Sequence, residues 1–330
     1  MAGIGSGICH WFHNGRFASS GGKRYGRLAP AAYALGAPMS RIALYSDKGD
    51  TRSSNQDSCC ALVANTRQGE VALVVVCDGV GGLERGEVAS AMVVRAFTSW
   101  FEEDLPNLMR SVRGDALLDS LEQAWRSLLD GLNDSIRAYG LRHSIKLGTT
   151  FTGLLAQGDS YLVGHVGDCR AYALREGRVT QLTEDQTLVS HLLAQGKLAP
   201  QEASASSLSN VILQSVGTSE RLDPAFVRGA LHEGDLMLLC SDGAYKTVDE
   251  PCLLRTFPWE TNKDALLEAA CRRLVEGARR AGERDNATIA CLRWGGGPAR
   301  GRSVASRTPA GPHDAQATPS TVVMLEGDRR

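Results

Sequence analysis

Apolar and polar residues follow one another along the middle of the chain in patterns that change from segment to segment. Residues 71–77 form an uninterrupted apolar run rich in β-branched side chains, which is typical of a strand buried on both faces. Between residues 115 and 139, apolar side chains recur at spacings of three and four, which predicts a long helix with one face in the core. The members of this stripe are Leu117, Leu121, Trp125, Leu128, Leu132, Ile136 and Tyr139.

The same reasoning outlines a domain between residues 39 and 294. It predicts further strands at 39–45, 149–155, 161–166, 170–174, 236–240 and 287–292, and helices at 84–101, 187–195, 201–205 and 264–280. Strands and helices interleave without a regular strand–helix–strand alternation. The predicted fold class is therefore α+β, with mostly antiparallel sheets.

Both ends of the chain differ from this domain. Residues 1–38 are rich in Gly, Ala and Ser and show no sustained period, so we predict a disordered N-terminal extension. We also hypothesise that Met39 is the true start of the protein. Residues 295–330 begin with Gly and Pro and stay rich in small and polar residues, which predicts a flexible C-terminal tail.

Overall composition narrows the classes of function. The 330 residues are 43% hydrophobic and carry a formal net charge of -1, so the chain can build a core and has no global basic field for nucleic acid. The sequence has no run of about 18 consecutive apolar residues, so we predict no membrane span. The N-terminus lacks a secretory signal, so we expect a cytoplasmic protein. The nine cysteines form no Cys-x-x-Cys pair, which favours buried reduced thiols over a zinc site or a thiol nucleophile.

Aspartates recur where the predicted strands end. Asp78 follows the run 71–77, Asp168 and Asp242 each follow an apolar strand, and Asp285 precedes the last strand. Each stands beside Gly or Asn. One Asp in such a place usually marks a turn, but four together favour carboxylates that converge. Clustered carboxylates repel one another unless cations lie between them, and hard oxygen ligands suit Mg²⁺ or Mn²⁺ better than zinc.

The polar segment 46–57 adds two candidates, Arg52 and Asp57, five residues apart. A guanidinium can bind two oxygens of one phosphate. Taken alone, a surface arginine is more often simply solvated.

The ordered series of motifs resembles the metal-dependent protein Ser/Thr phosphatases, the PPM family, in their bacterial form. The resemblance covers residues 42–293, and it implies a four-layer αββα sandwich of two mostly antiparallel β-sheets flanked by helices. It further implies a phosphatase domain at 39–294 with a mobile flap at about 188–211. The matching motifs are Ser46-Asp-x-Gly-x-x-Arg-x-x-Asn-Gln-Asp57, Val76-Cys-Asp78-Gly-Val-Gly-Gly82, Gly148-Thr-Thr150, His165-Val-Gly-Asp168-Cys-Arg170, Leu182-Thr-Glu-Asp185, Leu239-Cys-Ser-Asp242-Gly243 and Arg284-Asp285-Asn286.

The resemblance also implies the reaction, which is hydrolysis of phosphoserine and phosphothreonine by a metal-activated water at a site with two Mn²⁺ or Mg²⁺ ions. Asp78 would bridge both ions, Arg52 would hold the substrate phosphate, and Asp57 would order metal-bound waters. Arg52, Asp57 and Asp78 are thus the expected catalytic residues. The implied metal ligands are Asp57, Asp78, Gly79 through its carbonyl, Asp242 and Asp285, with Asp168 at a third, weaker ion and with Gln56 and Asn286 in support.

Three positions depart from the family pattern. Gln56 stands where many members have a Glu ligand, Val80 replaces a His assigned as general acid, and Gln186 replaces the His of an Asp-His-Ser segment. The resemblance implies phosphorylated proteins as substrates and a Ser/Thr kinase as the opposing partner. Neither nucleic acid nor a membrane is an expected partner.

Two other functions are compatible with the sequence. A pseudophosphatase would bind phosphoproteins without turnover. Gln56 would permit this, as would the flap, in which the Ser-rich residues 204–209 replace the family's usual His-Pro-Gln-Arg segment. A tail phosphorylated at Thr308, Thr318 or Thr321 could dock a phosphothreonine-reading domain.

Overall fold

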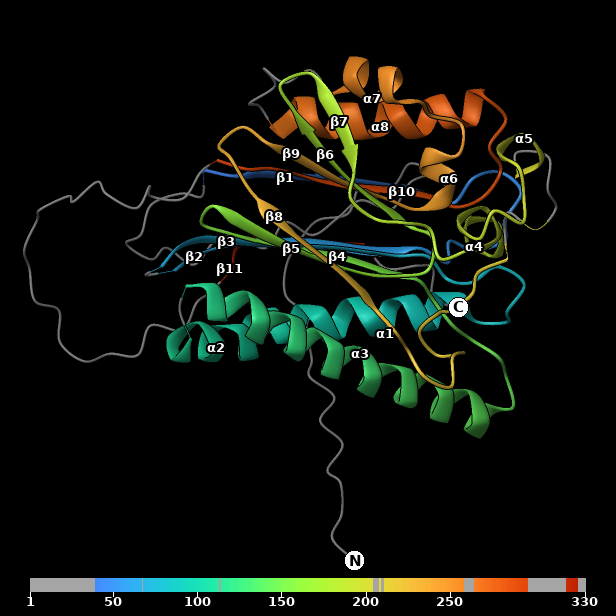
Figure 1. Ribbon diagram of the computed structural model, residues 1–330, viewed down its shortest axis with the longest axis horizontal. Helices are drawn as coiled ribbons and strands as arrows, with labels where there is room; N and C mark the ends of the chain where they lie inside the picture. The colour runs from blue at the N-terminus through green and yellow to red at the C-terminus, as the bar shows by residue number, and fades with distance from the viewer. Residues whose placement is uncertain are drawn as a thin grey trace, which may run out of the picture.

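The computed structural model describes residues 39–66, 68–112, 114–203, 208, 211–257, 264–295 and the backbone of 319–325. Two β-sheets are stacked face to face with helices outside each, which gives four layers (Figure 1). The predicted α+β sandwich of two antiparallel sheets is confirmed. The predicted N-terminal extension, residues 1–38, lies outside the described residues.

One sheet, which we call sheet A, has five strands in the order β1-β10-β9-β6-β7. All neighbouring strands are antiparallel, and the first strand pairs with β10 from Arg41 opposite Arg293 to Asp47 opposite Ala287. The chain therefore enters and leaves sheet A in adjacent strands. The strands are β1 (Arg41–Asp47), β6 (Arg170–Arg175), β7 (Arg178–Gln181), β9 (Leu236–Cys240) and β10 (Ala287–Arg293).

The other sheet, sheet B, has six strands in the order β11-β2-β3-β4-β5-β8, again antiparallel throughout. Its central strands are apolar over nearly their whole length, because one face meets sheet A and the other meets helices. The strands are β2 (Ser58–Thr66), β3 (Gly69–Cys77), β4 (Phe151–Gln157), β5 (Ser160–Val166), β8 (Ala225–Ala230) and β11 (Pro319–Leu325).

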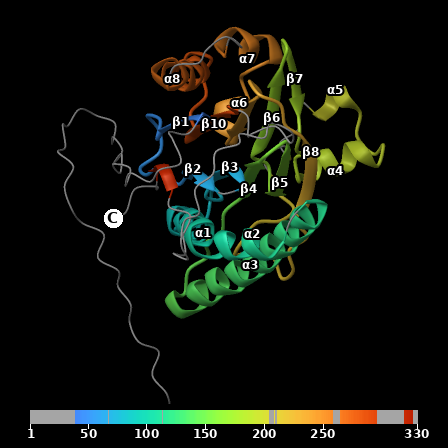
Figure 2. The same ribbon diagram turned by 90° about the vertical axis from the view of Figure 1, so that its left-hand side faces the viewer.

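Helices α1 (Gly86–Ser99), α2 (Leu105–Ser111) and α3 (Asp115–His143) cover sheet B, with a π-helical turn, Trp100–Asp104, joining the first two. Helices α7 (Glu250–Thr256) and α8 (Asp264–Arg280) cover sheet A. Three short helices, α4 (Leu188–Ala194), α5 (Pro200–Ala203) and α6 (Asp242–Tyr245), lie toward one end of the sheets (Figure 1). Figure 2 shows α4 and α5 outside the two helical layers. Among the described residues, no helix is long and apolar enough to cross a membrane.

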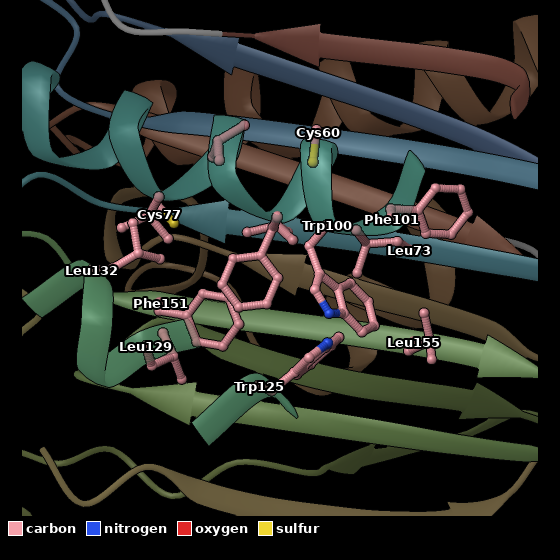
Figure 3. Packing of buried hydrophobic residues seen from close by; sticks show 14 of the residues in the cluster. Cys60, Leu73, Cys77, Trp100, Phe101, Trp125, Leu129, Leu132, Phe151 and Leu155 are labelled. Atoms are coloured by element: carbon pink, nitrogen blue, oxygen red, sulfur yellow. The ribbon is translucent and has the colours of Figure 1, made fainter. Parts of the chain in front are cut away.

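Two apolar layers hold the sandwich together. Between the sheets, fully buried side chains such as Val74, Leu154 and Leu239 meet. Between sheet B and its helices, Trp125 of α3 lies edge-on to Phe97 and Phe151, with ring centroids 5.2 and 5.9 Å away (Figure 3). This indole is fully buried, as its place in the predicted apolar stripe requires.

The helix and strand predictions miss several elements of the structure. Strands β2, β8 and β11 and helices α2, α6 and α7 were not predicted. The strand β2, whose residues 58–64 are all buried, was not predicted, because the run Ser-Cys-Cys-Ala-Leu-Val-Ala contains few of the β-branched and aromatic residues that indicate a strand. The strand β11 lies inside the predicted flexible tail and pairs with β2, so the structure differs from that expectation over these seven residues. The rest of the tail after Gly295 lies outside the described residues.

Candidate functional site

The predicted aspartates all lie at one end of the sandwich. Asp78 follows β3 and Asp57 precedes β2, and the pairing of Ser58 with Cys77 places these two strand ends side by side in sheet B. In sheet A, Asp242 follows β9, Asp285 comes just before β10, and Cys240 lies opposite Ile289. Asp168 joins β5 of sheet B to β6 of sheet A. The site is thus assembled from both sheets.

Asp57 connects the two sheets through hydrogen bonds. Its Oδ2 accepts from Ser241 Oγ at 2.9 Å and from Thr288 Oγ1 at 2.6 Å, and both donors belong to the sheet A side. The carboxylate is 1% exposed, and its Oδ1 has no hydrogen-bond partner among the described residues. A buried acceptor in this state is costly, so a ligand at Oδ1 would stabilise it.

Asp78 is held through its backbone. Its N–H donates to Thr150 Oγ1 at 2.9 Å, and its carbonyl accepts from Thr149 Oγ1 and from the Thr150 N–H, both at 2.8 Å. The next residue, Gly79, donates to the carbonyl of Gln56 at 3.1 Å. None of these hydrogen bonds involves the Asp78 carboxylate, so its oxygens can bind a ligand.

Gly79 has no room for a side chain. A Cβ at this position would lie 2.6 Å from the backbone carbon of Gly86 and 2.8 Å from the Gln56 carbonyl oxygen. The loop after β3, the start of α1 and the polar segment before β2 therefore meet at one backbone contact.

Arg52 forms a two-pronged ion pair with Asp285. Its Nε and Nη2 donate to Oδ1 and Oδ2 of the carboxylate at 2.8 and 2.6 Å, and the two side chains are 43% and 35% exposed. The predicted phosphate-binding side chain and one predicted metal ligand are thus in direct contact.

Asn286 holds the loop that carries Arg52. Its Nδ2 donates to the carbonyl of Lys48 at 2.8 Å and of Ser54 at 3.2 Å, and its Oδ1 accepts from the N–H of Gln56 at 2.9 Å. Toward Asp285, its contribution is a backbone N–H that donates to Oδ1 at 2.8 Å. The support that this side chain provides is directed mainly at the 48–56 loop.

The one-turn helix α6 connects Asp242 with Asp168. Lys246, which caps α6, donates to Asp242 Oδ2 at 2.5 Å, and the Tyr245 hydroxyl donates to the Asp168 carbonyl at 2.8 Å. The Tyr245 ring packs under Arg170 at 3.9 Å, and Arg170 forms a two-pronged ion pair with Asp185.

Burial and neighbouring negative charges raise the pKa of three of the acids, Asp57, Asp78 and Asp168. Burial, followed by repulsion from Asp242 and Asp285, raises the pKa of Asp57 to about 7, although bonds from its two hydroxyl donors oppose the shift. Burial and then the charges of the four other acids raise the pKa of Asp78 well above its usual range. Burial and then Asp242 raise the pKa of Asp168 to about 7, against the opposing charge of Lys246. Such mutual repulsion is relieved by cations.

Divalent cations fit this donor set by its chemistry. The candidate donors are carboxylate and backbone oxygens, which Mg²⁺ and Mn²⁺ prefer, and Asp57 Oδ1 is a buried acceptor in need of a partner. Within the described ranges, no three Asp, Glu, His or Cys side chains are grouped as a ready set of metal ligands. Two of the acids, Asp242 and Asp285, are instead paired with Lys246 and Arg52.

A groove of about 1020 Å³ lies beside this end of the molecule. It runs between α4, which belongs to the predicted flap, and the segment around residues 213–225. Its lining includes Arg170, Asp185, Gln186, His191, Leu193 and Leu213. The groove thus contacts the same Arg170–Asp185 pair that leads to Asp168.

Residues 49–276 match the profile of the protein phosphatase 2C family. The chain belongs to this family. This phosphatase 2C domain is 32% identical over 250 residues to the Serine/threonine protein phosphatase PstP of Mycobacterium tuberculosis, which covers 76% of this chain but only 44% of PstP. It is 30% identical over 253 residues to the Protein phosphatase PhpP of Streptococcus pneumoniae, covering 76% of this chain and 96% of PhpP.

Solved structures of the family match the fold. The S. agalactiae serine/threonine phosphatase is 28% identical with a TM-score of 0.66, over 77% of this chain and 99% of that one. The catalytic domain of PstP in complex with two manganese ions is 30% identical with a TM-score of 0.58, over 77% of this chain and 97% of that one. The predicted family is thereby confirmed.

Sequence reasoning did not find every residue that shapes the site. Ser241 and Thr288 hold Asp57, and Lys246 holds Asp242, yet none of the three was predicted. The spacing of four between Asp242 and Lys246 is the helical ion-pair spacing and could have indicated that contact. The two hydroxyl residues lie beside predicted ligands but give no signal of their own.

Proposed function

We propose that this chain is a protein phosphatase that hydrolyses phosphoserine and phosphothreonine in other proteins at a site with two Mn²⁺ or Mg²⁺ ions. The observation that carries the proposal is the position of four acids at one end of the two sheets, with the Arg52 guanidinium paired to one of them. The acids are Asp57, Asp78, Asp242 and Asp285. The family relatives, two of which are named Ser/Thr or protein phosphatases, support the same reaction.

The metal ligands would be Asp78, the Gly79 carbonyl, Asp242 and Asp285, with Asp57 directed at metal-bound water. When bound, two divalent cations supply Lewis acidity that offsets the phosphoryl charge and lowers the pKa of a water. Because these donors belong to different strands of both sheets, the stacked sandwich itself sets their positions.

Arg52 would bind and orient the phosphate. Its Nε and Nη2 already donate to the two carboxylate oxygens of Asp285, and two oxygens of a phosphate can accept in a similar geometry. Asp285 would then be released toward the metal site. The side chain is 43% exposed, so it can reach a phosphate on another protein.

Asp57 would orient the attacking water. Ser241 and Thr288 fix one carboxylate oxygen, which leaves the buried Oδ1 as the acceptor for a proton of that water. Positioning of this kind lowers the barrier because the reacting groups need no further ordering. Val80 offers no proton, so the leaving alkoxide would take its proton from water.

Phosphate release from a phosphothreonine peptide tests the proposal. The full chain should release phosphate with added Mn²⁺, and release should stop with excess chelator. Asp78→Asn should reduce kcat at least about 100-fold, because an electrostatic contribution of this kind is worth several kcal/mol. Asp159→Asn, an exposed acid in the β4–β5 turn, is the matched control and should leave the rate unchanged. No Mn²⁺-dependent release from the folded chain would refute the proposal.

The physiological partners follow from the reaction. We infer phosphoproteins as substrates and a Ser/Thr kinase of the same cell as the enzyme that phosphorylates them. The groove beside α4 supplies a surface on which the residues around the phosphorylated side chain could lie. We expect the protein to act in the cytoplasm.

A further inference from the structure

Lys246 lies where the family resemblance implies a third metal ion, and this deepens the proposed function. Its ammonium donates to Asp242 Oδ2 at 2.5 Å. It also interacts electrostatically with the buried Asp168. Asp168 and Asp242 both act on this ammonium, because Asp242 pairs with it directly and Asp168 lies within electrostatic range of it.

The position of the ammonium is fixed by local structure. Lys246 follows Asp242 by four residues, and its own N–H donates to the Asp242 carbonyl at 3.0 Å, closing the single turn of α6. On the same turn, Tyr245 donates its hydroxyl to the Asp168 carbonyl. One helical turn therefore ties Asp242, Lys246 and the Asp168 segment together. In contrast, Arg52 reaches Asp285 from a separate loop.

The ammonium remains charged in this setting. The ordinary pKa of a lysine ammonium is about 10.4, far above physiological pH, and the direct contact with Asp242 favours the charged form. The side chain is 34% exposed, so the pair with Asp242 is partly desolvated. A positive charge is thus present at all physiological pH values.

The acids around Asp168 leave little for a divalent ion. Asp242 gives Oδ2 to Lys246, and Asp185 gives both carboxylate oxygens to Arg170 at 2.8 and 2.7 Å. A hydrated divalent cation would still need one or two free carboxylates, and the ammonium that occupies Asp242 Oδ2 would repel it. The donor set at Asp168 therefore does not fit a third ion.

We propose that the Lys246 ammonium is a built-in cation shared by Asp242 and Asp168, and that this chain takes two divalent ions and no third at Asp168. The inference rests on the proposed two-metal function. Oδ1 of Asp242 stays available for one of the two ions. Lys246 thus acts as a positioning residue that fixes the orientation of one metal ligand.

Counting bound Mn²⁺ tests the inference without reference to activity. The chelator-treated full chain, dialysed against saturating MnCl₂, should bind about two ions per chain, as a two-metal site requires. Lys246→Met keeps the length of the side chain and removes the charge, and it should bind about three. Lys246→Arg should bind about two, because it keeps the charge. Arg178→Ala, which removes an exposed charge from β7, is the control and should also bind about two.

A second pair of variants locates the added ion. Asp168→Asn should leave the count at about two in the wild-type background and should return Lys246→Met from about three to about two. Three ions in the wild-type chain, or no added ion in a folded Lys246→Met variant, would overturn the inference. If Lys246→Met does not fold, a loss of one ion in Asp168→Asn alone would overturn it. A wild-type chain that binds no Mn²⁺ would instead contradict the proposed function.

Discussion

Arg52 and Lys246 each hold one carboxylate of the site, but they are attached to the chain differently. Arg52 belongs to a loop that Asn286 ties down at three backbone groups, and its guanidinium reaches solvent. Lys246 is part of the helical turn that carries its own partner. The first is therefore suited to exchange one anion for another, and the second is suited to remain in place.

Arg52→Ala should lower kcat/KM for a phosphorylated substrate by about 10- to 100-fold, because a hydrogen bond to a charged group is worth about 1.5–3 kcal/mol. Arg52→Lys should recover only part of this loss, since an ammonium lacks the fork. Steady-state kinetics would measure both. The stability of either variant should change by less than about 1 kcal/mol, because the ion pair with Asp285 is well exposed. An unchanged kcat/KM in Arg52→Ala would exclude phosphate binding by this residue.

His165 is a buried residue that the site does not use. It is 1% exposed, its Nε2 lies 3.1 Å from the Glu184 carbonyl, and its Nδ1 lies 2.9 Å from Thr152 Oγ1. The carbonyl can only accept, so Nε2 carries the proton of the neutral ring and Nδ1 accepts from the Thr152 hydroxyl. Burial lowers the pKa of His165 to about 4, against the opposing effects of Asp185 and two backbone groups.

This shift predicts a pH-dependent stability. In the unfolded chain His165 binds a proton with a pKa of about 6.5, whereas in the folded chain it binds one only near pH 4. Stability from this residue is therefore complete above pH 6.5 and is lost as the pH falls toward 4, by about 2 kcal/mol between pH 7 and pH 5.

Urea unfolding at both pH values measures this loss. His165→Gln keeps an acceptor and a donor and should show a smaller loss by about that 2 kcal/mol. The exposed His232→Gln is the control and should match the wild type. Equal losses in wild type and His165→Gln would contradict the assignment.

At the scale of elements, the connection between β3 and α1 determines how closely the loops of the site approach one another. Gly79 and Gly86 meet backbone to backbone, and the Gln56 carbonyl lies against the same point. This contact keeps Asp78, at the end of β3, against the segment that bears Asp57. Glycine is required at residues 79 and 86 because there is no space for a Cβ, and not because the backbone conformation excludes other residues.

Gly79→Ala should destabilise the domain by about 2 kcal/mol or more and abolish phosphatase activity, because its Cβ would overlap backbone atoms that cannot move aside independently. Gly81→Ala is a matched control in the same loop, since its nearest neighbour is an Arg52 nitrogen 3.6 Å from the Cβ position. That variant should change stability by less than about 0.5 kcal/mol. Urea unfolding compares the two. Equal stability of both variants would show that the loops can separate without cost.

At the scale of the whole molecule, β11 changes the C-terminal limit of the folded domain. We predict a domain that ends at residue 294, yet β11 adds a strand to the β2 edge of sheet B beyond that limit. An uncovered edge strand offers unpaired N–H and C=O groups to other chains. The strand β11 therefore covers the exposed edge of β2, although it contributes none of the acids of the site.

Truncation after Gly295 should leave turnover of a small phosphate ester unchanged, because every candidate site residue is retained. It should increase self-association at high concentration, since the β2 edge loses its partner. Light scattering and steady-state rates would measure the two effects. Truncation after Leu325, which keeps β11, is the control and should stay like the full chain. A large loss of turnover in the shorter chain would show that the domain boundary is wrong.

The fold could be predicted largely because its apolar runs are long and clearly periodic. Predicted strand 236–240 and helix 264–280 have the bounds that the structure gives to β9 and α8. The position of the acids at one end of the sandwich could be predicted because Asp78, Asp168 and Asp242 follow such runs, whereas their roles stay predictions. The pairing of Arg52 with Asp285, 233 residues away, could not, because local pattern carries no information on which loops meet across two sheets. The β11–β2 pairing was missed for the same reason.

The pairing of β1 with β10 has a practical consequence for how the domain can be joined to others. Arg41 and Arg293 are opposite each other at the far end of the ladder from Asp47 and Ala287, which lie toward the acids. A fusion partner placed before Arg41 would leave from that remote end, whereas β11 runs back along β2 and ends with Leu325 opposite Cys59, on the side of the acids. A module joined ahead of the domain would thus leave the approach to the acids open, and one joined behind β11 would need a linker that leads away from them.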